Sequence, residues 1–216
     1  MSGRILGFGG RILGSSKNIA KYINSPESLI YQKSKVLYGI FESKQSIVKN
    51  DNCFLVEGYT DVIKMHQCGI SNVVASSGTA LTENQIRLIN RLTKNITVVF
   101  DGDAAGSRAA LRGIDLILEQ GMNVKICNLP EGDDPDSFVS NKNLEEVQSY
   151  LNKNSKDFIV YKASLLLDDS ENDPVKKAAV IRDMVESISK ISDYIKRELY
   201  IKEFSSIMNI SEQVLY

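Results

Sequence analysis

The sequence has no tryptophan, one histidine, three cysteines and four prolines. Cys53, Cys68 and Cys127 are odd in number and widely spaced, which argues against a disulfide framework and excludes a zinc-binding cluster. We interpret them as reduced, mostly buried thiols of a cytoplasmic protein. No apolar run approaches the ~20 residues that cross a bilayer, and the N-terminus lacks the apolar segment of a signal peptide. We therefore expect neither secretion nor a membrane partner.

The composition is ordinary for a globular protein, but the charged residues are unevenly distributed along the chain. The 216 residues are 43% hydrophobic and 25% charged, which is enough to bury a core. Residues 1–50 hold eight basic against two acidic residues, a net charge of +6. Residues 51–140 hold seven against twelve (net −5), and residues 141–216 hold eleven against thirteen (net −2). A basic region joined to an acidic one indicates that phosphates bind the first and divalent cations the second.

The middle of the chain alternates short apolar runs with amphipathic stretches, which predicts an α/β fold with a parallel sheet covered by helices on both faces. The expected strands are 53–56, 72–75, 96–100 and 123–129, and the expected helices are 61–67, 83–92 and 104–120. Thr82 and Gln85 have the spacing of a capping box.

The two ends of the chain predict different structures. Residues 3–14 predict two short strands around a Gly9-Gly10 turn. Their glycine spacing does not fit a nucleotide-binding loop, so we interpret the glycines as turn and bulge positions. Residues 22–28 are expected to form a loop, and residues 35–47 a helix. The tail predicts a small helical bundle with two core stripes, one containing Val175 and Ile188 and the other containing Tyr194 and Phe204.

Acidic residues gather where three predicted strands end. Six carboxylates follow or flank these ends, with no basic partner evident in the sequence: Glu57, Asp61, Asp101, Asp103, Asp134 and Asp136. The carboxyl ends of parallel strands meet at one edge of a sheet, so we expect the six to converge. Asp101 with Asp103, and Asp134 with Asp136, are expected to share a face as alternate residues of extended chain. Such a cluster suits hard cations, Mg²⁺ or Mn²⁺, and two ions about 4 Å apart can assist phosphoryl transfer. His66 is interpreted as a surface residue.

Four motifs occur in an order and spacing that resemble the TOPRIM domain of bacterial DnaG-type DNA primases. They are Glu57-Gly58-Tyr59-Thr60-Asp61, Ala75-Ser76-Ser77-Gly78-Thr79-Ala80, Asp101-Gly102-Asp103-Ala104-Ala105-Gly106 and Asp134-Pro135-Asp136. Stretches around Arg11, Lys21 and Lys33 resemble the basic subdomain that precedes TOPRIM in those primases. The resemblance covers roughly residues 3–145.

The resemblance implies DNA-templated synthesis of short RNA primers by two-metal nucleotidyl transfer. It makes Glu57, Asp101 and Asp103 catalytic, and it assigns all six acids to the metals. Arg11, Lys21 and Lys33 would face nucleotide and template. The implied partners are single-stranded DNA, ribonucleoside triphosphates, the RNA primer and a replicative helicase.

The resemblance also implies three regions: a partial basic subdomain (1–50), a TOPRIM domain (51–145) and a helical subdomain (146–216). The family's zinc-binding domain and its helicase-binding domain are both expected to be absent, and activity of such a fragment alone is open.

Two kinds of alternative remain. The chain could be a non-catalytic module that binds nucleic acid or helicase and uses metal only structurally. It could also be another TOPRIM enzyme or an Asp-x-Asp phosphotransfer enzyme. A haloacid-dehalogenase-type phosphohydrolase fits less well, because Ala105 stands where that chemistry needs threonine or valine.

Overall fold

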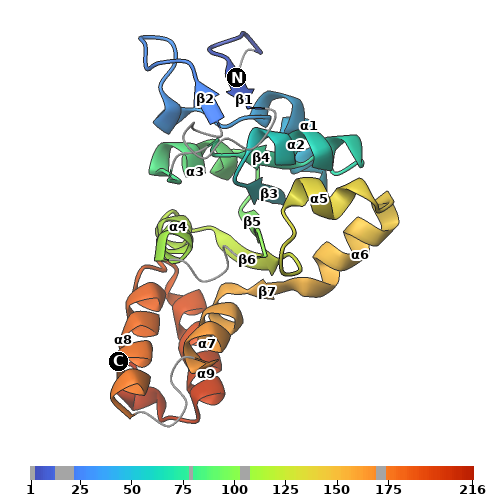
Figure 1. Ribbon diagram of the computed structural model, residues 1–216. Helices are drawn as coiled ribbons and strands as arrows, with labels where there is room; N and C mark the ends of the chain where they lie inside the picture. The colour runs from blue at the N-terminus through green and yellow to red at the C-terminus, as the bar shows by residue number, and fades with distance from the viewer. Residues whose placement is uncertain (1–2, 13–21, 78–79, 103–107, 169–173) are drawn as a thin grey trace.

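The computed structural model describes residues 3–12, 22–77, 80–102, 108–168 and 174–216. A β-hairpin lies at one end of the molecule, a group of helices lies at the other, and the main sheet lies between them (Figure 1). No helix in these ranges is both long and apolar enough to cross a membrane. The three cysteines are free, as predicted, with Cys53 and Cys127 buried.

The strands are β1 (Gly9–Arg11), β2 (Tyr22–Asn24), β3 (Cys53–Val56), β4 (Val73–Ala75), β5 (Asn95–Phe100), β6 (Asn123–Asn128) and β7 (Ser155–Asp157). The helices are α1 (Ile40–Asn50), α2 (Tyr59–Gln67), α3 (Glu83–Asn90), α4 (Arg108–Glu119), α5 (Pro135–Ser140), α6 (Leu144–Asn154), α7 (Phe158–Asp168), α8 (Pro174–Ser189) and α9 (Tyr194–Met208). Two short 3₁₀ helices cover Lys33–Lys35 and Glu212–Val214.

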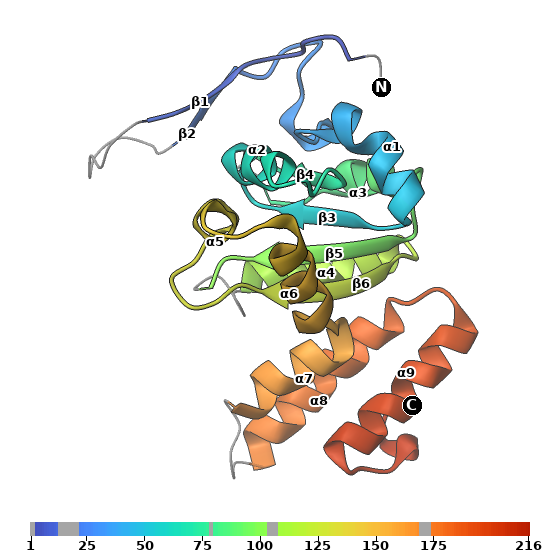
Figure 2. The same cartoon turned by 90° about the vertical axis from the view of Figure 1, so that its right-hand side faces the viewer.

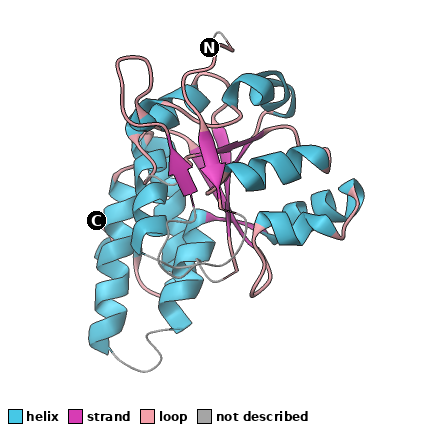
Figure 3. Cartoon of the chain, turned by 45° about the horizontal axis from the view of Figure 1, so that its top comes forward, coloured by secondary structure: helices cyan, strands magenta, loops and turns pink. Residues whose placement is uncertain are grey.

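The main sheet has the strand order β4-β3-β5-β6-β7. The first four strands are parallel, as predicted, because each is an apolar run connected to the next through helical chain. Strand β7 pairs antiparallel with β6 and was not predicted, since Ser-Lys-Asp carries no strand signal. Figure 3 shows these strands surrounded by helices.

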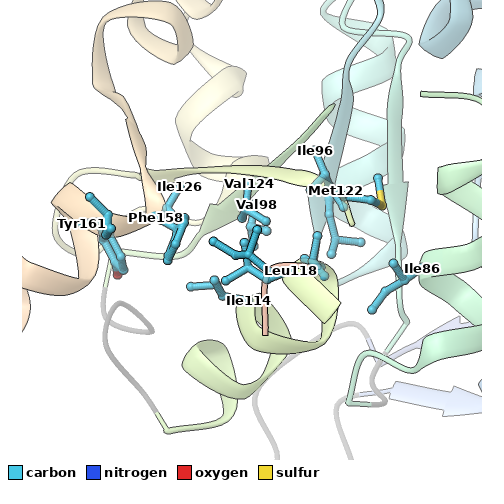
Figure 4. Packing of buried hydrophobic residues seen from close by; sticks show 14 of the residues in the cluster. Ile86, Ile96, Val98, Ile114, Leu118, Met122, Val124, Ile126, Phe158 and Tyr161 are labelled. Carbon is cyan, nitrogen blue, oxygen red and sulfur yellow. The ribbon is translucent and has the colours of Figure 1, made fainter. Parts of the chain in front are cut away.

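Two hydrophobic clusters cover the two faces of the sheet, which confirms the predicted layers. On one face, Ile96 and Val98 of β5 pack with Ile114 and Leu118 of α4 and with residues of α7 to α9 (Figure 4). On the other, Val99 packs with residues of α2, α5 and α6. Figure 2 shows α5 and α6 in front of the sheet and α4 behind it.

Three predictions for the N-terminal region are wrong. Gly9 and Gly10 lie inside β1 instead of forming a turn, and β1 pairs with β2 in the segment expected to be a loop. Helix α1 begins at Ile40, later than predicted, because Gly39 has a left-handed backbone (φ +80°). A side chain at Gly39 would place Cβ 2.9 Å from Val62, so glycine is needed where α1 meets α2.

The tail is helical as predicted, but its core stripes are only partly correct. Ile188, Phe204 and Met208 are buried, whereas Val175 is 78% exposed and Tyr194 is 64% exposed. Both exposed residues lie in the first turn of their helices.

Candidate active site at the carboxyl edge of the sheet

The edge formed by the carboxyl ends of β3, β5 and β6 carries the acidic residues that the structure describes. Glu57 follows β3, Asp101 follows β5, and the loop after β6 leads to Asp134. These three strands are adjacent and parallel, so their ends lie together. Asp61 lies in the first turn of α2, and Asp136 in the first turn of α5. Asp103 and Lys21 lie outside the described residues.

Asp61 has the clearest electrostatic signature of a shared site. The residue is only 6% exposed, and its Oδ2 accepts the Gly58 backbone N–H at 2.9 Å. The pKa of Asp61 is raised to about 6, chiefly by burial and in smaller part by the negative charges of Asp134, Asp136 and Glu57, while the Gly58 hydrogen bond opposes the shift. Four acids from two chain segments, residues 57–61 and 134–136, therefore lie close enough for their charges to interact.

Asp134 and Asp136 are positioned by a helix rather than by extended chain, so the prediction that they alternate along a strand is wrong. Asp134 caps the N-terminus of α5, where its Oδ1 accepts the Ser137 N–H at 2.8 Å, and Pro135 occupies the first helical position. The sequence Asp-Pro-Asp-Ser carries the signal of a helix start that would have revealed this.

Asp136 also has basic partners, contrary to the expectation of acids without a neighbouring base. Its carboxylate lies 3.5 Å from Nη1 of Arg11 and 3.7 Å from Nζ of Lys64. Arg11 comes from β1 and Lys64 from α2, so three elements distant in sequence meet at this carboxylate. Lys64 was not predicted, because its role depends on the position of α5.

Gly102 explains why the two acids of the Asp-Gly-Asp motif are separated by glycine. Its N–H donates to the Asp133 carbonyl at 2.9 Å. A Cβ on Gly102 would lie 2.1 Å from the Pro130 carbonyl oxygen and 2.8 Å from Cα of Glu131. Only glycine lets the loop after β5 approach the loop after β6 so closely, and this approach places Gly102, next to Asp101, against Asp133, next to Asp134.

The β1–β2 hairpin is attached to the same edge through Tyr59. The hydroxyl group of Tyr59 lies 2.9 Å from the Gly10 carbonyl oxygen and 3.3 Å from that of Ile23. At the end of β2, Nδ2 of Asn24 donates to the Ser77 carbonyl at 3.4 Å, and the Ser77 N–H donates to the Glu57 carbonyl at 3.0 Å. Asn24 and Ser77 were not predicted.

Lys33 lies apart from the acids. Its backbone N–H donates to Oε1 of Glu27 at 3.0 Å, and the residue lines a cavity of about 960 Å³ between the N-terminal segment and helices α1 and α2. His66 lines the same cavity and is exposed, as predicted. The structure therefore brings Arg11 to the acids and leaves Lys33 on the neighbouring wall.

The donors at this edge are carboxylate oxygens, which suit Mg²⁺ or Mn²⁺ better than softer metals. In the described part of the chain, no three His, Cys, Asp or Glu side chains converge closely enough to hold an ion by themselves. The described acids therefore suit a hard cation in the chemistry of their donors, but their side chains do not converge into a set of ligands as expected.

Three family models match this chain. They are Toprim-like (residues 54–139), the N-terminal domain of the DNA primase catalytic core (residues 1–44) and the DnaB-helicase binding domain of primase (residues 172–213). The third match corrects the expectation that a helicase-binding domain is absent. That expectation was wrong because the tail carries no short motif, only helical periodicity.

Known proteins resemble the chain along almost its whole length. A DNA primase of Clostridium acetobutylicum is 40% identical over 216 residues, which are 99% of this chain and 35% of the relative. The chain thus spans about a third of the length of such curated relatives. A crystal structure of a DNA primase domain from Pseudomonas aeruginosa is 34% identical with a TM-score of 0.86, and the alignment covers 99% of this chain and 67% of that one.

A structure of the DnaG primase catalytic domain bound to ssDNA is 30% identical with a TM-score of 0.84, covering 98% of this chain and 67% of that one. The fold, the order of the motifs and these relatives agree. The chain belongs to the DnaG family of bacterial DNA primases.

Proposed function

We propose that this chain carries the catalytic centre of an enzyme that synthesises short RNA primers on single-stranded DNA from ribonucleoside triphosphates. The observation that carries the proposal is the meeting of β3, β5 and β6 at one sheet edge, where Glu57, Asp101 and the loop that leads to Asp134 follow the three strands. Membership of the DnaG family supports the reaction, and the related domain solved with ssDNA supports the template.

In this proposal Glu57, Asp101 and Asp103 are the catalytic acids, and Asp61, Asp134 and Asp136 complete the ligand set. Bound Mg²⁺ or Mn²⁺ would supply positive charge at the primer 3′-hydroxyl and at the α-phosphate that it attacks, with pyrophosphate as leaving group. The carboxylates of these six residues would hold the metal ions in place.

The basic residues hold the substrates in this proposal. Arg11 pairs with Asp136 in the structure, so a nucleotide or template phosphate would compete for its guanidinium group. Lys21 and Lys33 would bind phosphates on the neighbouring surface.

We further propose that residues 1–50, 51–145 and 146–216 act as basic, TOPRIM and helical regions of a cytoplasmic protein. The helical region would contact a replicative helicase, because the DnaB-helicase binding model matches residues 172–213. This match also favours a second candidate function, a non-catalytic module that binds nucleic acid and helicase.

Primer synthesis on a single-stranded template with labelled ribonucleotides tests the proposal. We expect a product that requires Mg²⁺ or Mn²⁺ and that Glu57→Gln abolishes. The matched control is Glu145→Gln, the same substitution at an exposed position on α6, which should keep wild-type yield.

A metal-independent product, or full activity of Glu57→Gln, would contradict the enzyme. Template binding that is insensitive to Mg²⁺ and unchanged by Asp101→Asn, without any synthesis, would favour the non-catalytic module.

A further inference from the structure

Helix α9 carries apolar side chains on two opposite sides. The inner side packs into the hydrophobic cluster that it shares with α7 and α8, and its buried residues are Ile201, Phe204 and Met208. On the other side, Ile195 is 72% exposed and Leu199 is 61% exposed. These two residues are four positions apart, so their side chains are neighbours on the helix surface. An apolar surface therefore faces away from the core of the helical region.

The exposed stripe of α9 consists of Ile195, Leu199, Lys202 and Ser206, and we call it the outer face of α9. All four residues are exposed, and their spacing of four, three and four positions keeps them in one line along the helix. Neither core packing nor helix propensity favours apolar residues here, because Ile195 is β-branched and a weaker helix former than lysine or glutamate. Two neighbouring exposed apolar side chains form a surface of the kind that marks contact with another molecule.

The family model that matches this part of the chain indicates the partner. The DnaB-helicase binding model matches residues 172–213, which include the whole of α8 and α9. The inner side of α9 is buried within the chain, so its side chains are not available to a second protein. A partner that binds the matched residues at α9 would therefore contact the outer face, where Ile195 and Leu199 are accessible.

The outer face of α9 begins near the sheet edge opposite to the acids. Nζ of Lys196, the residue after Ile195, donates to Oδ1 of Asn123 at 2.7 Å, and Asn123 is the first residue of β6. The loop that leads to Asp134 follows the other end of this strand, roughly 17 Å away at about 3.3 Å per residue. Figure 1 shows α9 at the end of the molecule opposite to the β1–β2 hairpin. A partner docked on this face does not have to cover the acidic edge.

We propose that this chain contacts the replicative helicase through the outer face of α9, with Ile195 and Leu199 at the centre of the contact and Lys202 at its polar rim. The proposal rests on the proposed function in one respect, that the helical region binds a helicase. It adds the surface that is used and the chemistry of the contact, apolar at the centre and polar around it, as in other protein interfaces.

The test measures binding of the full chain to the DnaB helicase of Clostridium acetobutylicum, the source of a DNA primase 40% identical to this chain. Biolayer interferometry with the chain immobilised gives the dissociation constant. Replacing Ile195 and Leu199 together by serine should raise it by about tenfold, because few residues at the centre of an interface carry most of the binding energy. Leu199→Lys, which keeps a good helix former at an exposed position, should weaken binding in the same direction.

The matched control replaces Val48 and Val160 together by serine. Both are exposed valines on helices outside residues 172–213, Val48 on α1 and Val160 on α7, so this variant should bind the helicase like wild type. Urea unfolding of each variant establishes that it is folded. Wild-type affinity of the folded α9 variants, or an equal loss in the control, would overturn the assignment of the surface and leave the helicase as partner.

Two further outcomes would also overturn the proposal. If the wild-type chain does not bind the helicase, the helicase contact fails together with the surface, while the primer-synthesis assay still decides the catalytic proposal. If sedimentation shows a wild-type dimer that serine at Ile195 and Leu199 dissociates, a second copy of this chain occupies the outer face of α9 instead.

Discussion

The carboxyl group of Asp61 is buried near three other carboxylates, yet it is also bonded to a backbone N–H at the start of α2. The hydrogen bond needs only an acceptor oxygen, which a protonated or amidated side chain also supplies. The charge is therefore not required for the fold, and at neutral pH it opposes folding. A buried charge that disfavours the fold in the absence of a ligand is typical of functional sites.

Asp61→Asn should raise the free energy of unfolding at neutral pH. The pKa of Asp61 is about 6 in the folded protein against 3.8 ordinarily, so the folded state binds the proton more tightly. Stability from this group is therefore greatest below about pH 4 and falls as pH rises through about 6. The difference amounts to at most about 3 kcal/mol, and asparagine, which cannot ionise, removes it.

Urea unfolding of Asp61→Asn and wild type at about pH 4.5 and about pH 7.5 measures this effect. The advantage of the variant should grow toward the higher pH. Asp193→Asn is the control, since Asp193 is an exposed helix cap on α9 and its substitution should give no such growth. A constant difference between Asp61→Asn and wild type at both pH values would contradict the raised pKa.

Gly102→Ala should destabilise the protein by about 1–3 kcal/mol, the usual range for forced overpacking. The new Cβ would fall 2.1 Å from a backbone oxygen that no side-chain rotation can move away. Gly113→Ala is the matched control, because Gly113 is inside α4 with its nearest neighbour 3.9 Å from the added atom. It should stabilise by about 0.5–1 kcal/mol.

Chemical unfolding of the two glycine variants checks that Gly102→Ala lowers the free energy of unfolding and that Gly113→Ala raises it. Equal effects of Gly102→Ala and Gly113→Ala would show that the loops after β5 and β6 are not in the tight contact described here.

The acidic residues themselves could be identified from sequence, because the segments that contain them, at Glu57, Asp101 and Asp134, follow the apolar runs that form β3, β5 and β6. The residues that pair with these acids in the folded protein could not be identified from sequence. The pairing of Asp136 with Arg11 and Lys64 depends on α5 packing against α2 and on β1 lying near Asp136. The helix cap formed by Asp134 is predictable from the sequence Asp-Pro-Asp-Ser, but the two acids were interpreted only as metal ligands.

Among the elements, the parallel strands were predicted because hydrophobic burial on both faces leaves a clear signal. The β1–β2 hairpin leaves no such signal of burial in the sequence. Ile23 of β2 is exposed, the paired segment contains two glycines, and the hairpin is held from outside by Tyr59. Its existence therefore depends on a tertiary contact that no local pattern encodes.

Tyr59→Phe should loosen this hairpin without disturbing α2. The ring stays buried beside Tyr38, but the hydrogen bond from the hydroxyl to the hairpin carbonyls is lost. We expect faster hydrogen exchange of the β1–β2 amides and a loss of about 0.5–1.5 kcal/mol in unfolding free energy.

Tyr150→Phe is the control for that measurement, because its hydroxyl donates to the carbonyl of Asn128, the last residue of β6, and not to the hairpin. It should lower stability similarly and leave exchange of the β1–β2 amides unchanged. Unchanged exchange in Tyr59→Phe would mean that the hairpin is held by other contacts.

At the scale of the whole molecule, the basic and acidic regions predicted from the sequence lie next to each other. Arg11 reaches Asp136, and Lys33 lines a cavity that extends to Tyr59 and Ser77 beside the Glu57 loop. A nucleic-acid strand that follows the basic N-terminal region would thus pass next to the acidic edge, with its phosphates on the cationic side.

This arrangement predicts that affinity for single-stranded DNA falls as salt rises, because bound cationic side chains release counterions from the phosphates. Each phosphate contact contributes roughly 0.7 to the slope of log affinity against log salt. Replacing Lys33 and Lys35 together by alanine should lower the slope by about 1.4 and weaken binding at about 50 mM salt. Replacing Lys153 and Lys156, which are exposed at the end of α6 and on β7, should change neither quantity. Fluorescence anisotropy of a labelled oligonucleotide from about 50 to about 200 mM salt measures both pairs. Equal slopes for the two double variants would show that the template does not follow the N-terminal basic region, and the arrangement of template beside acids would then be wrong.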